Sequence, residues 1–275
     1  MKQGQIIRIN AGFYDIISDN KEYRTRGSGN LRNSGVTPLV GDFVNFEPDG
    51  FLLNVLERKN FLNRPKVANL DQVIVITSLI EPKYSSLLLN KFLAIIEFNN
   101  IEPIIVFTKK DLTKDSYLQE YIDQGYKTFE ISNKDKDSLM ELKPIFKNKL
   151  SVFTGQTGAG KSTTINSLTN LNLKTQKISK SLGRGKHTTR VVQIYDWFGG
   201  RLIDTPGFSS LEFNLTKLQL ANSYKDFKNL ATKCKFKNCL HSKEPNCKVI
   251  DKVNKTISIN RYNDYIKILK ECPYE

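Results

Sequence analysis

The sequence lacks any long hydrophobic run and contains few cysteines and histidines, four and two in 275 residues. No apolar run approaches the roughly 20 residues that a membrane-spanning helix needs. Residues 1–8 carry no apolar stretch of the kind found in a secretory signal peptide. We therefore expect a cytoplasmic protein that binds no membrane, in a reducing compartment where cysteines serve as metal ligands more readily than as disulfides.

Acidic residues are outnumbered by basic ones. The chain has 42 lysines and arginines against 28 aspartates and glutamates, which gives a formal net charge of +14. No acidic residue occurs between positions 142 and 195, whereas basic residues recur throughout that stretch. This balance indicates a polyanionic partner, nucleic acid more readily than a membrane, although general solubility is the alternative explanation.

We expect the N-terminal part of the chain, residues 1–65, to form a small separate domain. A chain of 275 residues is long enough for two domains, or for three if some are small. Short segments bounded by Gly, Asn and Pro predict β-strands over 5–9, 13–18, 22–26, 42–47 and 51–57. Such strands are typical of an OB-type β-barrel, and an SH3-like barrel fits the periodicity equally well.

The middle part, residues 66–215, alternates continuous apolar strands with helical segments. Strands are expected over 73–77, 104–107, 127–131, 150–154, 191–195 and 201–203, and helices over 85–98, over 116–124 and from 161 onward. This alternation predicts an α/β domain with a parallel sheet covered by helices. Residues 216–275 are lysine-rich and helical, with a cysteine cluster, and predict a small third domain.

A glycine-rich loop stands between an expected strand and an expected helix. It reads Gly155-Gln156-Thr157-Gly158-Ala159-Gly160-Lys161-Ser162 and is followed by Thr163. This is the GxxxxGKS phosphate-loop pattern, in which backbone amides at a helix N-terminus hold phosphate oxygens. Lys161 would supply a cation and Ser162 a hydroxyl for Mg²⁺. A chance glycine-rich turn is the alternative.

A second motif, Thr108-Lys109-Lys110-Asp111, follows another apolar strand. The Asp111 carboxylate can accept hydrogen bonds from N1 and N2 of guanine, a donor pair that adenine lacks, so the motif predicts GTP and GDP as ligands. Lys109 would pack its stem along the base. Ser132, at the end of a further strand, would complete the base site. Usual GTPases have Asn in place of Thr108, and an ordinary charged turn is the alternative interpretation.

A third motif, Asp204-Thr205-Pro206-Gly207, ends the last expected strand. Asp204 can hold Mg²⁺ through water, and the Gly207 amide can meet the γ-phosphate. Thr188 or Thr189, which precede a strand, can ligate Mg²⁺ only while the γ-phosphate is present, as switch segments do.

The glutamine that orients the attacking water in many GTPases is missing, because Phe208 stands at its position. His187 is the nearest candidate for this task, since a neutral imidazole near pH 7 can accept a proton. The alternatives are that His187 contacts RNA or only shapes the switch. If it is catalytic, His187→Ala should lower turnover and leave nucleotide affinity nearly unchanged.

The order of these motifs is itself informative. In an ordinary GTPase the phosphate loop comes first and the base-reading loop near the end, whereas here the base-reading motif comes first. The order indicates a circularly permuted GTPase. It also ties the segment from Asp204 to Gly207 directly to the C-terminal domain, so that its collapse after hydrolysis would reorient that domain.

The C-terminal domain contains a compact set of metal-ligating residue types. The spacing is Cys-x4-Cys-x-His-x5-Cys, formed by Cys234, Cys239, His241 and Cys247. Three thiolates and one imidazole fill a tetrahedral shell, which predicts one structural Zn²⁺. Buried thiols in a helical bundle are the alternative, and Cys272 is left over as an ordinary thiol.

Together these residues resemble the RsgA family, also called YjeQ, of circularly permuted GTPases. Besides the three nucleotide motifs, the resemblance is carried by Val40-Gly41-Asp42, Asn63-Arg64-Pro65, Gly185 to Thr189 and the Cys-Cys-His-Cys cluster. It implies an OB barrel in residues 1–65, a permuted GTPase domain in 66–215 and a zinc domain in 216–275. Within the family a hydrophobic residue also replaces the catalytic glutamine, and the resemblance favours Thr189 as the Mg²⁺ ligand.

The resemblance further implies a function late in assembly of the bacterial small ribosomal subunit. Its implied partners are that subunit and its rRNA, GTP and GDP, with hydrolysis stimulated by the subunit and release following hydrolysis. We expect a monomer in which Lys161, His187 and Thr189 act in hydrolysis. Two alternatives stay open, a permuted GTPase that serves the large subunit and an RNA-binding module with vestigial nucleotide turnover.

Overall fold

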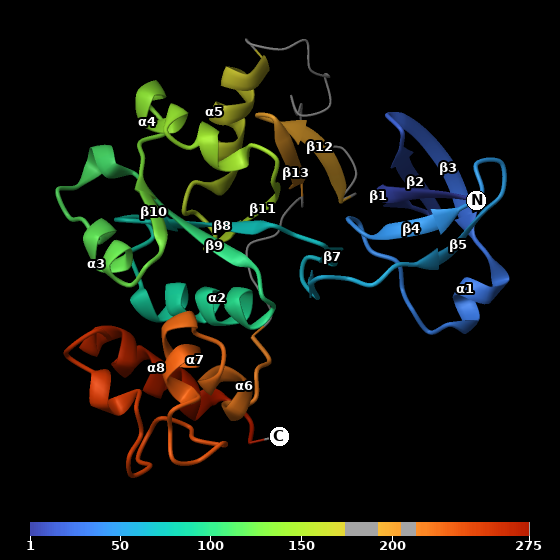
Figure 1. Cartoon of the computed structure of the whole chain (residues 1–275). Coiled ribbons are helices and arrows are strands. Elements are labelled where there is room, and N and C mark those ends of the chain that lie inside the picture. Colours follow the sequence, from blue (N-terminus) through green and yellow to red (C-terminus); the bar gives the residue numbers. More distant parts are fainter. Residues whose placement is uncertain (174–191, 205–212, 275) are drawn as a thin grey trace. The chain divides into compact units, whose positions relative to one another are not determined.

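The computed structural model describes residues 1–173, 192–204 and 213–274 (Figure 1). Two compact units account for its contacts. The first comprises Met1–Gln72, Leu139–Phe153 and the described residues of Ser162–Ser209. The second comprises Val73–Ser138, Thr154–Lys161 and the described residues of Ser210–Glu275. Among the described residues, no helix combines the length and the apolar character that crossing a bilayer requires.

The N-terminal strands close into a five-stranded barrel. They are β1 (Lys2–Asn10), β2 (Phe13–Ser18), β3 (Lys21–Gly27), β4 (Phe43–Phe46) and β5 (Phe51–Val55). Pairing runs from β1 to β2, β3, β5 and β4, and β4 pairs with β1 to complete the ring. Only the β3–β5 contact in this ring is parallel. The OB-type barrel predicted from the sequence is confirmed, with each strand close to its expected range.

Alternating apolar side chains fill this barrel. Ile6, Ile16, Val44, Phe46 and Leu52 form one buried cluster. A short helix, α1 (Gly29–Asn33), joins β3 to β4 and adds Leu31 to the cluster, with 4% of its surface exposed. The sequence did not predict this helix, nor the two-stranded sheet of β6 (Phe61–Leu62) and β7 (Val67–Ala68) that follows the barrel.

Three strands of the first unit come from the middle of the chain. β11 (Leu150–Gly155) pairs in parallel with β13 (Gly200–Asp204), with Leu150 opposite Arg201. β12 (Gln193–Trp197) and β13 form an antiparallel hairpin. The 3₁₀ helix η2 (Lys143–Phe146) precedes β11, and α5 (Lys161–Leu173) follows it after the glycine-rich loop.

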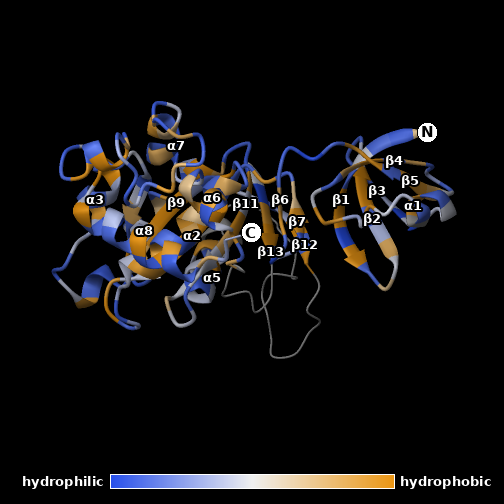
Figure 2. Ribbon diagram, turned by 90° about the horizontal axis from the view of Figure 1, so that it is seen from below, coloured by the Kyte–Doolittle hydropathy of each residue, from blue (hydrophilic) through white to orange (hydrophobic). Residues whose placement is uncertain are grey.

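The second unit begins with two strands that are almost completely buried, β8 (Gln72–Ser78) and β9 (Glu102–Thr108), and a third, β10 (Lys127–Glu130), that is only partly buried. Strands β9 and β10 pair in parallel. Every residue of β8 is buried, and β9 is drawn in the hydrophobic colour in Figure 2. The connecting helices are α2 (Ser86–Phe98), η1 (Lys110–Leu112), α3 (Leu118–Asp123) and α4 (Lys136–Met140). Continuous burial explains why β8 and β9 read as nearly unbroken apolar runs, whereas the partly buried β10 does not.

The C-terminal part of this unit is helical, as expected. It contains α6 (Lys217–Ala221), α7 (Lys225–Ala231), η3 (Ile250–Lys252) and α8 (Ile259–Glu271). Thr216 and Gln219 exchange hydrogen bonds that cap the start of α6. Phe227 and Tyr265 meet edge to face in the core between α7 and α8, with ring centroids 4.9 Å apart.

Candidate functional site

The glycine-rich loop leaves β11 and enters α5 at Lys161, in the context that the sequence predicts. Gly155 has φ +139°, and a Cβ there would lie 2.0 Å from the carbonyl oxygen of Ile76, so only glycine fits. Gly160 has φ +93° and lies next to the side chains of Asn133 and Thr108. Ser162 and Thr163 occupy the first turn of α5 and are exposed. The loop therefore leads into a helix N-terminus at which two hydroxyl side chains are exposed to solvent.

Thr108 connects the base-reading motif to the glycine-rich loop. Its side chain is fully buried, and its hydroxyl donates a hydrogen bond of 2.5 Å to the carbonyl of Ala159. The same hydroxyl lies 3.4 Å from the carbonyl of Thr77. Although usual GTPases have Asn here, this threonine still holds the two loops together.

Asp111 lines a cavity in the second unit. Its Oδ1 accepts a hydrogen bond of 2.9 Å from the hydroxyl of Ser132, and its Oδ2 pairs with the ammonium of Lys134 at 2.9 Å. The hydrogen bonds from Lys134 and then Ser132 lower the pKa of Asp111, so the carboxylate stays ionised. The cavity measures about 460 Å³. The structure thus brings Ser132 and Asp111 together and adds Lys134, which sequence reasoning missed.

Lys109 has a left-handed backbone conformation, with φ 64°. Its ammonium group donates a hydrogen bond to the carbonyl of Glu81, in the loop before α2. This contact fixes the direction of the stem that we expect to lie along the base.

The four candidate metal ligands converge in the turns between α7 and α8. The ligand atoms of Cys234, Cys239, His241 and Cys247 all lie within 4.8 Å of one another. The Nδ1 atom of His241 is 3.3 Å from Sγ of Cys247 and 3.8 Å from Sγ of Cys234. These separations suit the edges of a tetrahedron with metal–ligand bonds of about 2.0–2.3 Å. Burial lowers the pKa of His241, which favours the neutral imidazole that a metal requires.

Glu244 shapes the loop that carries the last two ligands. Its carboxylate accepts hydrogen bonds from the backbone N–H groups of Leu240, Ser242 and Lys243, at 2.8–2.9 Å. Despite opposing burial, these bonds lower its pKa to about 2. The N–H of Lys248 lies 3.3 Å from the Cys234 sulfur, a contact that stabilises a ligating thiolate. Sequence reasoning missed this role of Glu244, because a lone acidic residue among lysines has no distinctive spacing.

Several predicted site residues lie outside the described residues. These are His187, Thr188, Thr189, Gly207 and Phe208. Asp204 is the last residue of β13 in the first unit, where it pairs with Gln193 across the hairpin. The roles predicted for these residues therefore remain predictions.

Comparison with known proteins identifies the family. A family model described as the RsgA GTPase matches residues 55–214, and a model of the RsgA N-terminal domain matches residues 3–50. The chain belongs to the RsgA GTPase family. The two matches cover most of the barrel and every nucleotide motif, so the resemblance seen in the sequence is confirmed.

Relatives of this family match the chain from end to end. A protein of Mycoplasmopsis agalactiae, named small ribosomal subunit biogenesis GTPase RsgA, is 46% identical over 99% of both chains. A protein of Bacillus subtilis with the same name is 39% identical over 98% of this chain and 97% of its own.

Two solved structures share the fold. The crystal structure of YloQ, described as a circularly permuted GTPase, superposes with a TM-score of 0.80 at 34% identity, over 98% of this chain and 94% of that one. YjeQ from Thermotoga maritima gives a TM-score of 0.82 at 30% identity, over 98% of both chains. The base-reading motif of this chain precedes its phosphate loop, an order that agrees with the description of YloQ as a circularly permuted GTPase.

Within this RsgA framework, Lys161 is half-buried, and burial lowers its pKa to about 8. A phosphate ligand needs the charged ammonium, which predominates in the free protein below that pH. We expect GDP affinity to be constant below about pH 8 and to fall above it by up to about tenfold per pH unit, because binding must then take up a proton. Calorimetry in buffers of different ionisation enthalpy would detect that proton.

The variant Lys161→Arg is the matched control for this pH dependence. Arginine stays protonated throughout the range, so the proton uptake should vanish even if the affinity is lower. Proton uptake near pH 8 that persists in Lys161→Arg would assign it to another group.

Proposed function

We propose that the chain hydrolyses GTP in the maturation of the small ribosomal subunit, binds the rRNA of that subunit and leaves it after hydrolysis. The observation that carries this proposal is a hydrogen bond between the base-reading motif and the phosphate loop. The hydroxyl of Thr108 donates it to the carbonyl of Ala159. The proposal is supported by the fact that Asp111 and the glycine-rich loop, residues 155–161, belong to the same compact unit. Full-length relatives with the name small ribosomal subunit biogenesis GTPase supply the biological setting.

The residues divide the chemistry of GTP binding between them. Asp111 accepts from the guanine base, and Ser132 and Lys134 hold its carboxylate in place. Backbone amides from Gly155 to Lys161 take the phosphates, with the Lys161 ammonium as the cation. Ser162 and Asp204 would hold Mg²⁺, which neutralises charge on the phosphates when it is bound.

The switch residues complete the proposal. Thr188 or Thr189 would sense the γ-phosphate through the metal, the Gly207 amide would meet it directly, and His187 would orient the attacking water. Phe208 cannot polarise water, which is why another side chain must take this part.

The cysteine cluster is proposed to hold one structural Zn²⁺. Its three thiolates and the Nδ1 atom of His241 leave no coordination position for a substrate in a tetrahedral shell. Exposed lysines surround it, among them Lys233, Lys235, Lys237 and Lys243. We propose that this surface meets rRNA, because phosphate contacts dominate affinity for nucleic acid. We further propose that the protein acts as a cytoplasmic monomer.

The proposed function is tested by GTP turnover with purified ribosomal subunits. We expect slow hydrolysis alone and at least tenfold stimulation by the small subunit, with none by the large subunit. His187→Ala should remove most of the stimulated rate and leave GDP affinity within about twofold. Stimulation by the large subunit alone would favour a different assembly role, and binding without any turnover would favour an RNA-binding module.

A further inference from the structure

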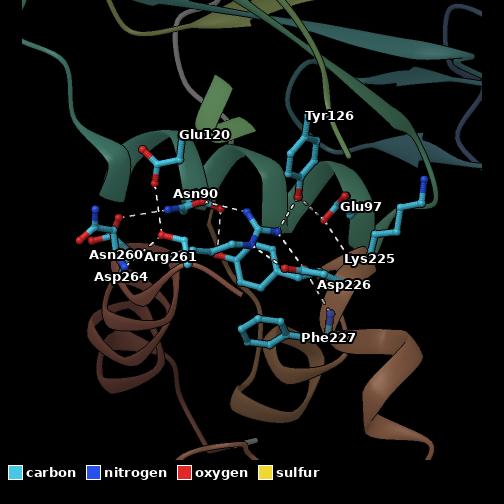
Figure 3. Close-up of polar contacts among 12 residues, drawn as sticks. Asn90, Glu97, Glu120, Tyr126, Lys225, Asp226, Phe227, Asn260, Arg261 and Asp264 are labelled. Carbon is cyan, nitrogen blue, oxygen red and sulfur yellow. Dashed lines mark hydrogen bonds and ion pairs between the residues drawn. The ribbon is translucent and has the colours of Figure 1, made fainter. Parts of the chain in front are cut away.

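A buried polar network joins α2 to the C-terminal helices, with Arg261 at its centre (Figure 3). Only 1% of the surface of Arg261 is exposed. Its guanidinium pairs with the Asp226 carboxylate through Nε and Nη2, at 3.0 and 3.1 Å. Nη1 donates to Oδ1 of Asn90 at 3.1 Å, and Nη2 donates to the hydroxyl of Tyr126 at 2.5 Å. Asp226 and Arg261 come from the C-terminal helices, whereas Asn90 lies on α2.

On α2, Asn90 makes the hydrogen bonds that connect this helix to the network. It is buried, and its Nδ2 donates to Oδ2 of Asp264 at 3.0 Å while its Oδ1 accepts from Arg261. Its backbone carbonyl accepts a hydrogen bond of 3.0 Å from the hydroxyl of Tyr224. The ring of Tyr224 also stacks on the guanidinium, 4.4 Å from its centre. One residue of α2 is therefore bonded to α8 and to the residue that precedes α7.

A second attachment lies two turns further along α2, at Glu97. Its carboxylate accepts from the backbone N–H of Lys225 at 3.1 Å and from the hydroxyl of Tyr126 at 3.2 Å. Tyr126 thus touches both attachments. Directional bonds of this kind fix one orientation between packed helices, which apolar side chains alone specify less strictly.

At its N-terminal end, α2 follows a segment that contacts the nucleotide loops. In the segment before the helix, the carbonyl of Glu81 accepts from the ammonium of Lys109. Cδ of Pro82 lies within 3.5 Å of the position that a Cβ on Gly158 would occupy. Tyr84 stacks on Tyr117 with centroids 4.0 Å apart, and Ser85 caps the helix. The segment just before α2 therefore contacts the base-reading and phosphate loops, and the helix that follows it contacts the C-terminal domain along its length.

We propose that α2 and the segment before it form a rigid connection, through which nucleotide binding changes the conformation of the cysteine-containing C-terminal domain. Arg261 is the positioning residue that couples α2 to that domain. The inference rests on the proposed function in that guanine nucleotide must bind these loops. This route is different from the one expected from the sequence, in which the segment after Asp204 acts on the C-terminal domain through its covalent link. Every contact of the α2 route lies in the second unit. Coupling of this kind is reciprocal, so contacts made by the C-terminal domain would alter nucleotide affinity by the same factor.

Hydrogen exchange of the full-length protein tests this coupling. Amides of residues 213–274 would be compared without nucleotide, with GDP and with a non-hydrolysable GTP analogue. In the wild-type protein we expect nucleotide to change exchange in α7 and α8 at least fivefold. Arg261→Lys keeps the positive charge but loses the planar guanidinium and its fixed set of hydrogen-bond donors. In this variant the nucleotide-dependent change in exchange should shrink to less than twofold, while nucleotide still binds.

Lys91→Ala is the matched control, because it removes an exposed ion pair with Glu271 at the rim of the same helix interface. This variant should respond like the wild type. Tyr126→Phe removes one hydroxyl from the network and should give an intermediate response. It replaces Arg261→Lys as the test variant if Arg261→Lys loses the zinc ion proposed for the cysteine cluster. A wild-type response in Arg261→Lys that retains its metal would overturn the proposal. So would nucleotide binding to the wild type with no change in the C-terminal helices, whereas an absence of guanine nucleotide binding in calorimetry would overturn the proposed function as well.

Discussion

Asp111→Asn is expected to change the base preference of the protein from guanine to xanthine. The wild-type carboxylate can accept from both N1–H and the N2 amino group of guanine. An asparagine amide has one acceptor and one donor, which match N1–H and the O2 atom of xanthine instead. Loss of two charge-assisted hydrogen bonds should weaken GDP binding by about 100-fold or more. Competition between GDP and xanthosine diphosphate for the purified protein measures the change.

Lys110→Ala is the control for this exchange. Lys110 neighbours Asp111 in sequence, but its ammonium pairs with Glu130 at 2.9 Å and has no assigned part in base reading. Its loss should leave the preference for guanine intact. An Asp111→Asn variant that still binds GDP with wild-type affinity and ignores xanthosine diphosphate would show that another group reads the base.

The sequence was sufficient for those features that local patterns determine. The buried strand β8 reads as an apolar run, and the glycine-rich loop between β11 and α5 needs positive φ at Gly155 and Gly160, which only the glycines meet at low cost. The cysteine and histidine spacing was likewise enough to predict that the four ligand atoms converge. Each of these signals lies within about fifteen residues of chain.

The contacts that the sequence did not reveal join residues far apart in the chain. Lys134 reaches Asp111 from a different strand end, and its charge has no special spacing. Arg261 meets Asn90 across 171 positions, and α8 shows the ordinary pattern of an amphipathic helix around it. The choice between OB-type and SH3-like barrels depended on the pairing of β3 with β5, which strand periodicity does not encode.

If the cysteine cluster holds the proposed zinc ion, removal of that ion is expected to unfold the segment between α7 and α8. In the described structure, residues 232–258 contain no helix or strand except η3, and most of their backbone hydrogen bonds lie around η3, between residues 247 and 257, so that few hold the stretch from 235 to 246. The buried side chains of residues 232–258 include three of the four ligands, Cys239, His241 and Cys247. Binding of a structural zinc ion to a small domain contributes about 10–16 kcal/mol, comparable with the whole stability of a typical domain. Loss of the ion therefore removes most of what keeps this segment folded.

The consequence should also reach the helices on either side. The hydroxyl of Tyr262 donates to the carbonyl of His241 at 2.9 Å, and the hydroxyl of Tyr265 donates to the carbonyl of Leu240, so the metal loop supports one face of α8. A strong chelator, or Cys247→Ser, should release one zinc ion per chain and raise amide exchange across 232–258 by at least 100-fold. Cys272→Ser is the control, because that buried thiol bonds to the carbonyl of Ile268 and lies outside the cluster. It should retain the metal and the wild-type exchange pattern. A metal-free protein whose loop stays protected would mean that packing around Tyr265, rather than coordination, holds the C-terminal domain together.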